Sequence, residues 1–253
     1  DVDRFGVGDT PQYTFQKGLK SYIHEPGTYA PRSTMIQRTV TVATELISVH
    51  PEMEISQLQG GRFGGIANLK NVAKQELVGR KNSILWNTLI ASVETSAALT
   101  QYYAVASTGT VAEKTNCLVS GIDYVDDIAP GGVKAIVGRR SALGWLNELG
   151  SFGVNIAESV KEKVERTGGK VIGTFRGIPV VTLHQYTDAY DVNRINSDNI
   201  MIVADGTTKL VVTEDLSQLE EINVDDRMWH VHFSEKYGAV VFYPERNARI
   251  AIV

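Results

Sequence analysis

The sequence predicts an α+β fold with an elongated body, and two observations support it. Residues 66–98 repeat apolar side chains at helical spacing, for example at Leu69, Val72, Ala73 and Leu77. A continuous helix of that length would be roughly 50 Å long at 1.5 Å per residue, which makes it the spine of the molecule. Beyond it, short helical and strand patterns alternate, and the last residues, from 227 on, are all strand-like.

The N-terminal 32 residues have little apolar periodicity. They contain seven glycines and prolines, which break regular structure. Such a stretch cannot build a core of its own, so we expect an arm that lies extended across another surface or remains mobile.

A two-stranded projection is predicted over residues 33–65. Apolar and polar residues alternate over 38–44, where Val40 and Val42 share one face, and a second extended piece follows over 46–55. Pro51 favours an edge or a tip, and the glycine-rich residues 60–65 end the projection. Because a lone hairpin is marginal in water, something else must cover its apolar side chains.

Two clear turn signals occur in the second half of the chain. Arg176-Gly177 separates strand patterns at 170–175 and 178–183, and Asp205-Gly206 separates those at 200–204 and 207–213. We expect a hairpin at each position. A further turn is predicted at 235–238, within the strands that end the chain.

The composition excludes several classes of protein. The 253 residues are 43% hydrophobic and 21% charged, which excludes collagen-like, coiled-coil and disordered chains. The formal charge of −4 lacks the positive excess of a dedicated nucleic-acid binder. No run approaches the ~18 apolar residues of a membrane span, and no secretory leader is visible. The single cysteine, Cys117, excludes an internal disulfide and is read as a small buried apolar group.

The sequence contains no established catalytic motif. It lacks a phosphate loop, a dinucleotide fingerprint, a G-x-S-x-G nucleophile turn and the H-E-x-x-H zinc motif. Asp226, His230 and His232 form the best metal candidate, since alternate residues of a strand share one face. No third or fourth ligand is evident, so an exposed strand face is the simpler interpretation.

The clustered charges are better explained as solvated faces or salt bridges than as acid–base pairs. Adjacent carboxylates on a strand point to opposite faces, and those on a helix lie on its polar side. We therefore expect no enzyme activity and no cofactor. The groups concerned are Asp123, Asp126 and Asp127; Glu220 and Glu221; Asp225 and Asp226; and Arg139 and Arg140.

Three stretches resemble the major capsid protein of tailed double-stranded-DNA phages, the Hong Kong 97 fold. Gly173-Thr-Phe-Arg-Gly-Ile-Pro-Val-Val181 is similar to a family stretch that ends in Gly-x-Pro-Val-Val. Asp198-Asn-Ile-Met-Ile-Val-Ala-Asp-Gly206 resembles the strand and turn that follow it. Pro51-Glu-Met-Glu-Ile-Ser56, running on through Gly60-Gly61, resembles the base of the family's extended loop. The order of the predicted elements extends this likeness over nearly the whole chain.

The resemblance implies four structural parts. They are an N-terminal arm (1–32), an extended loop (33–65), a peripheral domain with the spine helix (66–115 and 226–247) and an axial domain (116–225 and 248–253). It also implies a function: many copies, as hexamers and pentamers, form an icosahedral shell that encloses double-stranded DNA in a virion assembled in the host cytoplasm. A portal, a scaffolding segment or protease, and a decoration protein are the further partners it implies. No membrane is involved. The chain begins at Asp1, which fits removal of a scaffolding segment or omission of leading residues.

Ten residues are the predicted assembly contacts. The apolar ones are expected to lack an intramolecular partner, and the arginines are candidates for ion pairs between subunits. They are Met35, Ile36, Val40, Val42, Leu46, Met53 and Ile55, with Arg32, Arg38 and Arg62. Some relatives join subunits through a lysine of the extended loop. Since this chain has no lysine between Lys20 and Lys70, we expect a non-covalent shell, or help from a cement protein.

Three alternatives stay open. An encapsulin-type nanocompartment shares the fold, although residues 1–32 lack that family's amphipathic starting helix. A metal-dependent hydrolase would use Asp226, His230 and His232. An ordinary α/β binding module would be a globular monomer.

Overall fold

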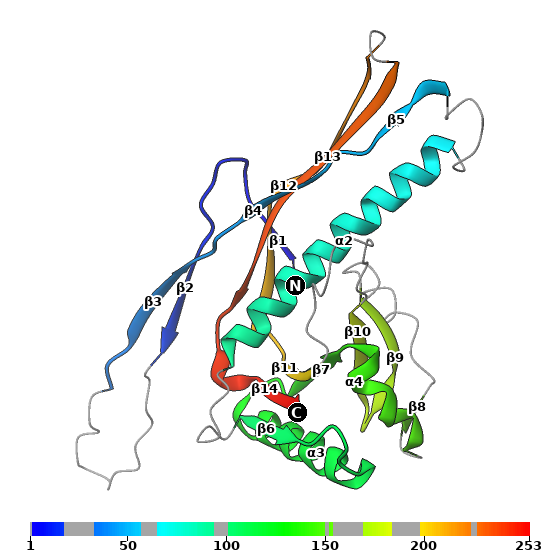
Figure 1. Ribbon diagram of the computed structural model, residues 1–253. Helices are drawn as coiled ribbons and strands as arrows, with labels where there is room; N and C mark the ends of the chain where they lie inside the picture. Colours follow the sequence, from blue (N-terminus) through cyan, green and yellow to red (C-terminus); the bar gives the residue numbers. More distant parts are fainter. Residues whose placement is uncertain are drawn as a thin grey trace, which may run out of the picture.

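The computed structural model describes residues 2–17, 33–56, 65–93, 101–149, 152–153, 169–183, 198–223 and 227–253. Figure 1 shows an elongated molecule in which a long hairpin and a helix extend from an α/β lobe, and a two-stranded ribbon projects to the side. We call these parts the blade, the lobe and the ribbon. The elongated shape agrees with the prediction of a spine helix.

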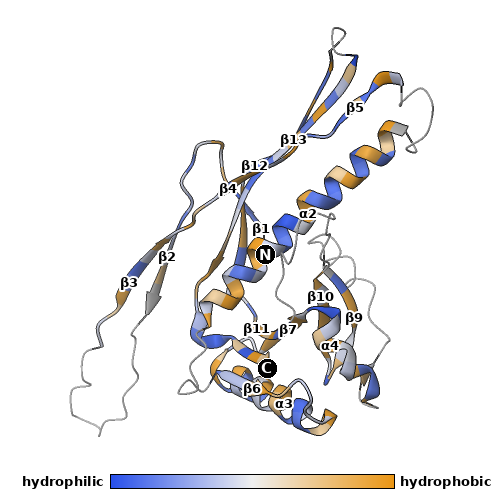
Figure 2. Ribbon diagram, viewed as in Figure 1, coloured by the Kyte–Doolittle hydropathy of each residue, from blue (hydrophilic) through white to orange (hydrophobic). Residues whose placement is uncertain are grey.

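The spine is a single helix, α2 (Gly65–Ser92), of 28 residues. The polar stretch over 79–83 does not interrupt it, because there α2 passes from one sheet to another. Ala73 packs against the blade, and Trp86 packs against the lobe. Residues thirteen apart lie about 220° apart around a helix of 3.6 residues per turn, so α2 uses nearly opposite faces for the two contacts. The alternation of apolar and polar segments along α2 in Figure 2 reflects this double use.

The blade contains a five-stranded sheet whose centre is the long hairpin of β12 and β13. On one side β1 pairs with β12 over residues 210–212, and on the other side β4 and β5 pair with β13. The predicted turn at 235–238 is wrong, since β13 continues through it. The strands are β1 (Val2–Arg4), β4 (Glu45–Val49), β5 (Glu52–Glu54), β12 (Thr208–Asn223) and β13 (Met228–Val241).

Burial along β13 changes phase at Gly238. From residue 229 to 237 the odd-numbered side chains are buried, on the face that α2 covers. From Gly238 on, the even-numbered positions Val240 and Phe242 are buried on the opposite face. Residues 42–43 cross that face so closely that a Cβ on Gly238 would lie 2.3 Å from the Ala43 carbonyl oxygen.

The lobe is built on a seven-stranded sheet in the order β6-β14-β11-β7-β10-β9-β8. Helix α3 (Val111–Ile128) packs its buried face on one side, and the end of α2 packs on the other. A capping box starts α3: Glu113 N donates to the Thr110 hydroxyl, and the Glu113 carboxylate accepts from Thr110 N. The strands are β6 (Tyr102–Val105), β7 (Val133–Gly138), β8 (Phe152–Gly153), β9 (Gly169–Phe175), β10 (Ile178–Leu183), β11 (Asn199–Ala204) and β14 (Ala248–Ile252). The short helices are α4 (Arg140–Leu143), η1 (Gly144–Glu148) and η2 (Pro244–Arg246).

One of the two predicted hairpins is confirmed. Arg176 and Gly177 have φ values of 51° and 82°, and they join the antiparallel strands β9 and β10. The hairpin at Asp205-Gly206 is wrong, because β11 lies in the lobe sheet and β12 in the blade sheet. A buried amide bridges the transfer point: Asn247 Oδ1 accepts hydrogen bonds from Ala204 N and the Thr207 hydroxyl, each at 3.0 Å.

The same transfer corrects the expected domain boundaries. Strand β12 falls within 116–225, the expected axial part, but it pairs with β13 in the blade. Strand β6 falls within 66–115, the expected peripheral part, but it pairs with β14 in the lobe. The expected boundaries therefore follow chain order, whereas the two sheets exchange strands across it.

The ribbon combines the arm with the extended loop. Strand β2 (Gln12–Lys17) of the arm pairs with β3 (Ile36–Thr41) of the loop. The described arm residues lie extended across the blade of their own chain. The Phe15 ring lies 5.3 Å from the Tyr243 ring, and Asp3 accepts hydrogen bonds from the Tyr13 hydroxyl and Lys209, each at 2.7 Å.

Candidate functional site

The structure divides the ten predicted assembly residues into three groups. Arg32 and Arg62 lie outside the described residues. Val42 and Met53 are core residues, 4% and 8% exposed, so the expectation that they lack an intramolecular partner is wrong. The reason is pairing: β4 and β5 lie on β13 and do not form a free hairpin, which turns Met53 toward Trp229 and the α2 side.

The other six predicted residues remain at least partly open to solvent. Val40 and Ile55 are half-buried, and Arg38 is exposed. Met35, Ile36 and Leu46 are 47%, 62% and 61% exposed, which is high for large apolar side chains. These three and Arg38 are therefore available for contacts outside the chain.

The ribbon has one apolar face that extends past the body. Val40, opposite Tyr13, packs on Phe242 and its neighbours. Because alternate residues of a strand share a face, the same face continues through Arg38 to Ile36. Both of these side chains are exposed, and Ile36 lies beyond Phe15, the residue opposite Arg38 that packs on Tyr243. We call the segment 36–38 of this face the overhang.

Over residues 229–237 of β13, the blade has one face that α2 covers and one face that it leaves uncovered. Even-numbered residues of β13 from His230 to Lys236 point away from α2, together with their cross-strand neighbours. Among those neighbours Leu219 is 68% exposed and Leu46 is 61% exposed. We call this surface the open face. The sequence analysis did not identify Leu219, because its neighbours are set by the register of β12 against β13. The alternating His230 and His232 were the available sign that this face of β13 is polar and exposed.

The open face gathers three imidazoles. His50, just after β4, has its ring centroid 5.7 Å from that of His230 and 5.7 Å from that of His232. His230 Nδ1 is buried without a hydrogen-bond partner among the described residues, and it lies 3.7 Å from Glu52 Oε2. His50 supplies the third imidazole that the predicted metal site lacked, whereas Asp226 lies outside the described residues.

Neither metal nor acid–base chemistry gains support from the geometry. Within the described parts of the chain, no three His, Cys, Asp or Glu side chains are placed to hold a metal ion. Asp126 accepts a hydrogen bond from Val133 N, so this carboxylate binds the backbone at the start of β7. Glu220 pairs with Lys70 on the α2 side of the blade, and Glu221 lies opposite His230 on the other side.

The thiol of Cys117 is no better suited to catalysis. It is half-buried and packs against the lobe core. Burial raises the pKa of this thiol, which disfavours the nucleophilic thiolate. Among the described helices, none is long and apolar enough to cross a bilayer.

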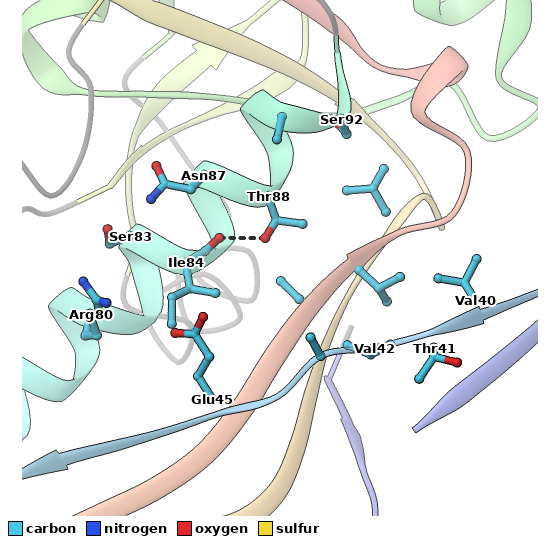
Figure 3. Close-up of a pocket in the computed structure, with 15 residues that line it drawn as sticks. Val40, Thr41, Val42, Glu45, Arg80, Ser83, Ile84, Asn87, Thr88 and Ser92 are labelled. Carbon is cyan, nitrogen blue, oxygen red and sulfur yellow. Dashed lines mark hydrogen bonds between the residues drawn. The ribbon is translucent and has the colours of Figure 1, made fainter. Parts of the chain in front are cut away.

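A groove of about 620 Å³ lies between α2, the chain that joins β3 to β4, and the end of β13 (Figure 3). It exists because β4 pairs with β13 only as far as Tyr237, which leaves one edge of β13 open at residues 239–241. Arg80 and Glu45 are the only ionisable residues among those that line it. The Thr88 hydroxyl donates a hydrogen bond to the Ile84 carbonyl oxygen. The lining therefore contains no nucleophile–base pair.

Comparisons with known proteins find likeness at the level of structure. No family model and no curated protein sequence matches the chain. A solved structure from Microbacterium phage Oxtober96 matches 100% of this chain and 89% of its own, with a TM-score of 0.65 at 12% identity. The mature capsid of bacteriophage PhiM1 matches 100% of this chain and 85% of its own, with a TM-score of 0.63 at 14% identity.

A third match is the virus-like particle from Pyrococcus furiosus. It covers 98% of this chain and 89% of its own, with a TM-score of 0.58 at 16% identity. All three matches extend over the blade, the lobe and the ribbon. The chain therefore has the Hong Kong 97-type fold of phage major capsid proteins, as the resemblance in its sequence implied.

Proposed function

We propose that this protein is the structural subunit of an icosahedral capsid, which self-assembles from many copies and encloses double-stranded DNA in a virion. The observation that carries the proposal is the match of the whole chain to the mature capsid of bacteriophage PhiM1 and to a structure from Microbacterium phage Oxtober96. Exposed apolar side chains on the ribbon and on the outer strands of the blade also support it, because the described part of the chain leaves Ile36, Leu46 and Leu219 open to solvent. The role is structural and not catalytic.

Contact between copies is proposed to join the overhang of one copy to the open face of the next. The ribbon already packs this face on its own blade, at Val240 and Phe242 below Gly238. The uncovered part of the same sheet face begins directly above, so the overhang fits an equivalent surface on a second copy. Arg38 would there meet the carboxylates Glu52 and Glu221. Met35, Ile36, Arg38 and Leu46 are thus the retained assembly residues, with Leu219 added.

The remaining parts of the proposal concern contents and partners. A formal charge of −4 suits a shell that holds DNA by enclosure and does not grip phosphates. Assembly in the host cytoplasm, with a portal, a scaffolding segment or protease, and a decoration protein, completes the proposal. The absence of lysine between Lys20 and Lys70 predicts that denaturing gels of purified particles show single subunits without a ladder of linked ones.

Electron microscopy of the purified protein tests the function. We expect closed particles at micromolar concentration and nuclease-resistant DNA in particles from infected cells. A protein that elutes as a monomer at every concentration tested would contradict the proposal.

Charge reversal tests the proposed contact. Arg38→Glu should block assembly, and Arg38→Glu combined with Glu221→Arg should restore it in part. Arg140→Glu is the matched control, because Arg140 is an exposed arginine of α4 in the lobe, away from both surfaces. Normal particles from Arg38→Glu would remove Arg38 from the contact while leaving the function standing.

The match to the virus-like particle favours one second candidate, a nanocompartment of the encapsulin type. Its shell would have the same geometry but would hold a cargo protein. Mass spectrometry and nucleic-acid staining of the same particles distinguish the two.

A further inference from the structure

The three imidazoles of the open face lie among carboxylates. Glu52 is opposite His230 on β5, Glu54 follows on the same face, and Glu221 is opposite His230 on β12. Lys236 and Glu214 pair with each other farther down the face at 4.0 Å. The remaining nearby pair, Lys70 with Glu220, lies on the α2 side of the sheet.

The charge of this surface therefore depends on protons. With neutral imidazoles, Glu52, Glu54 and Glu221 give it a charge of −3. With all three imidazoles protonated, the sum is zero. Histidine is the side chain whose charge ordinarily changes between pH 5 and 8.

We propose that His50, His230 and His232 make the contact between copies sensitive to pH, so that acid weakens it. The inference rests on the proposed function, since it concerns the contact between the overhang and the open face. Arg38 is the charged side chain that the described overhang brings to this contact. At neutral pH it meets a negative surface. At acid pH it meets imidazolium groups beside the same carboxylates.

The direction of the pH dependence follows from the linkage between proton binding and assembly. A guanidinium placed beside the cluster disfavours proton uptake, so the docked state binds fewer protons than the separated copies. Assembly must then weaken as pH falls through the range in which the imidazoles gain charge.

The test measures the lowest concentration that yields particles, by light scattering, at pH 7.5 and 5.5 and constant ionic strength. For the unaltered protein we expect this concentration to rise roughly tenfold at pH 5.5, the size of one partly screened charge interaction. The variant His50→Gln/His230→Gln/His232→Gln should show less than about a twofold change. The matched control removes the other two histidines, His24→Gln/His184→Gln, and should behave like the unaltered protein.

A second variant keeps the test decisive if the triple substitution impairs folding. Arg38→Gln changes an exposed side chain, and it should reduce the pH dependence by removing the charge that the imidazoles repel. The proposal is overturned if the unaltered protein assembles equally well at both pH values, or if either variant keeps the full pH dependence. Failure to form particles at any pH would instead reject the proposed function.

Discussion

The lobe sheet and the blade sheet differ in how completely this chain covers them. In the lobe, α3 packs on one face and the end of α2 on the other, so β11 is buried along nearly its whole length. Above Gly238 the blade has α2 on one face and solvent on the other. The lobe sheet is thus covered on both faces within one chain, whereas one face of the blade is left open for the proposed contact with a second copy. Folding and assembly should depend on different residues of the same molecule.

The largest effect should come from the point where α2 meets the lobe. Trp86 is fully buried there beside Met201. Trp86→Ala should reduce the free energy of unfolding by about 3–5 kcal/mol, through lost burial and a cavity. Chemical denaturation of the unassembled protein measures this. A loss below about 1 kcal/mol would contradict the difference between the two sheets, because only an exposed residue should tolerate truncation to alanine at so small a cost.

The crossing at Gly238 should give the next largest effect. Gly238→Ala places a methyl group against the Ala43 carbonyl and should cost about 1–3 kcal/mol. Gly144→Ala is the matched control, because nothing lies within 4 Å of its Cβ position and its backbone is helical. Similar melting temperatures for the two variants would contradict the close crossing.

The contact between the arm and the blade, in which Asp3 accepts hydrogen bonds from Tyr13 and Lys209, should weaken in acid with a smaller effect on stability. The hydrogen bond from Lys209, followed by that from Tyr13, lowers the pKa of Asp3 below its ordinary value of 3.8. A carboxylate with a lowered folded-state pKa stabilises the fold above its unfolded-state pKa, and this contribution is lost as pH falls through the folded-state value. Asp3 and Lys209 are each about a third exposed, so the contribution is about 0.5–1 kcal/mol.

Hydrogen exchange of nearby backbone amides measures this contact between the arm and the blade. The amides of Phe5 and Val42 bond to Val212 and Pro11, and they should lose protection below pH 4. Asp3→Asn should reproduce the loss at neutral pH. Arg4→Gln, which breaks the exposed pair with Asp215, should leave protection unchanged.

The smallest effect on stability should be on the open face. Leu219→Ser should change the free energy of unfolding by less than about 0.5 kcal/mol, because its side chain has little contact to lose. The same change should raise the concentration needed for particles. A variant that unfolds the monomer would place Leu219 in a core and contradict the uncovered face.

The sequence predicted the elements better than their partners. Helical spacing from Ile66 located α2, and Arg176-Gly177 located its hairpin, because both signals are local. The Asp205-Gly206 turn looked equally strong, but β12 pairs with β13, and Asn247, about forty residues away, binds the backbone at the transfer point. No local pattern carries that information.

The candidate surface was predicted only in part for the same reason. Ile36, Arg38 and Leu46 were identified and are exposed, whereas Met53 was placed outside and lies in the core. Alternation shows that two faces of a strand differ, but which face is covered depends on how β4 and β5 lie on β13. His50 was missed because its neighbours are about 180 residues away in the chain.

The change of phase at Gly238 has a consequence for how this gene can vary. Along β13, hydrophobicity should be required at odd positions before the glycine and at even positions after it. A saturation library of the strand should therefore show a two-residue rhythm of tolerated substitutions that slips by one position midway. Gly238 itself should tolerate the fewest substitutions, because the buried face of the strand changes there and a side chain would collide with the Ala43 carbonyl.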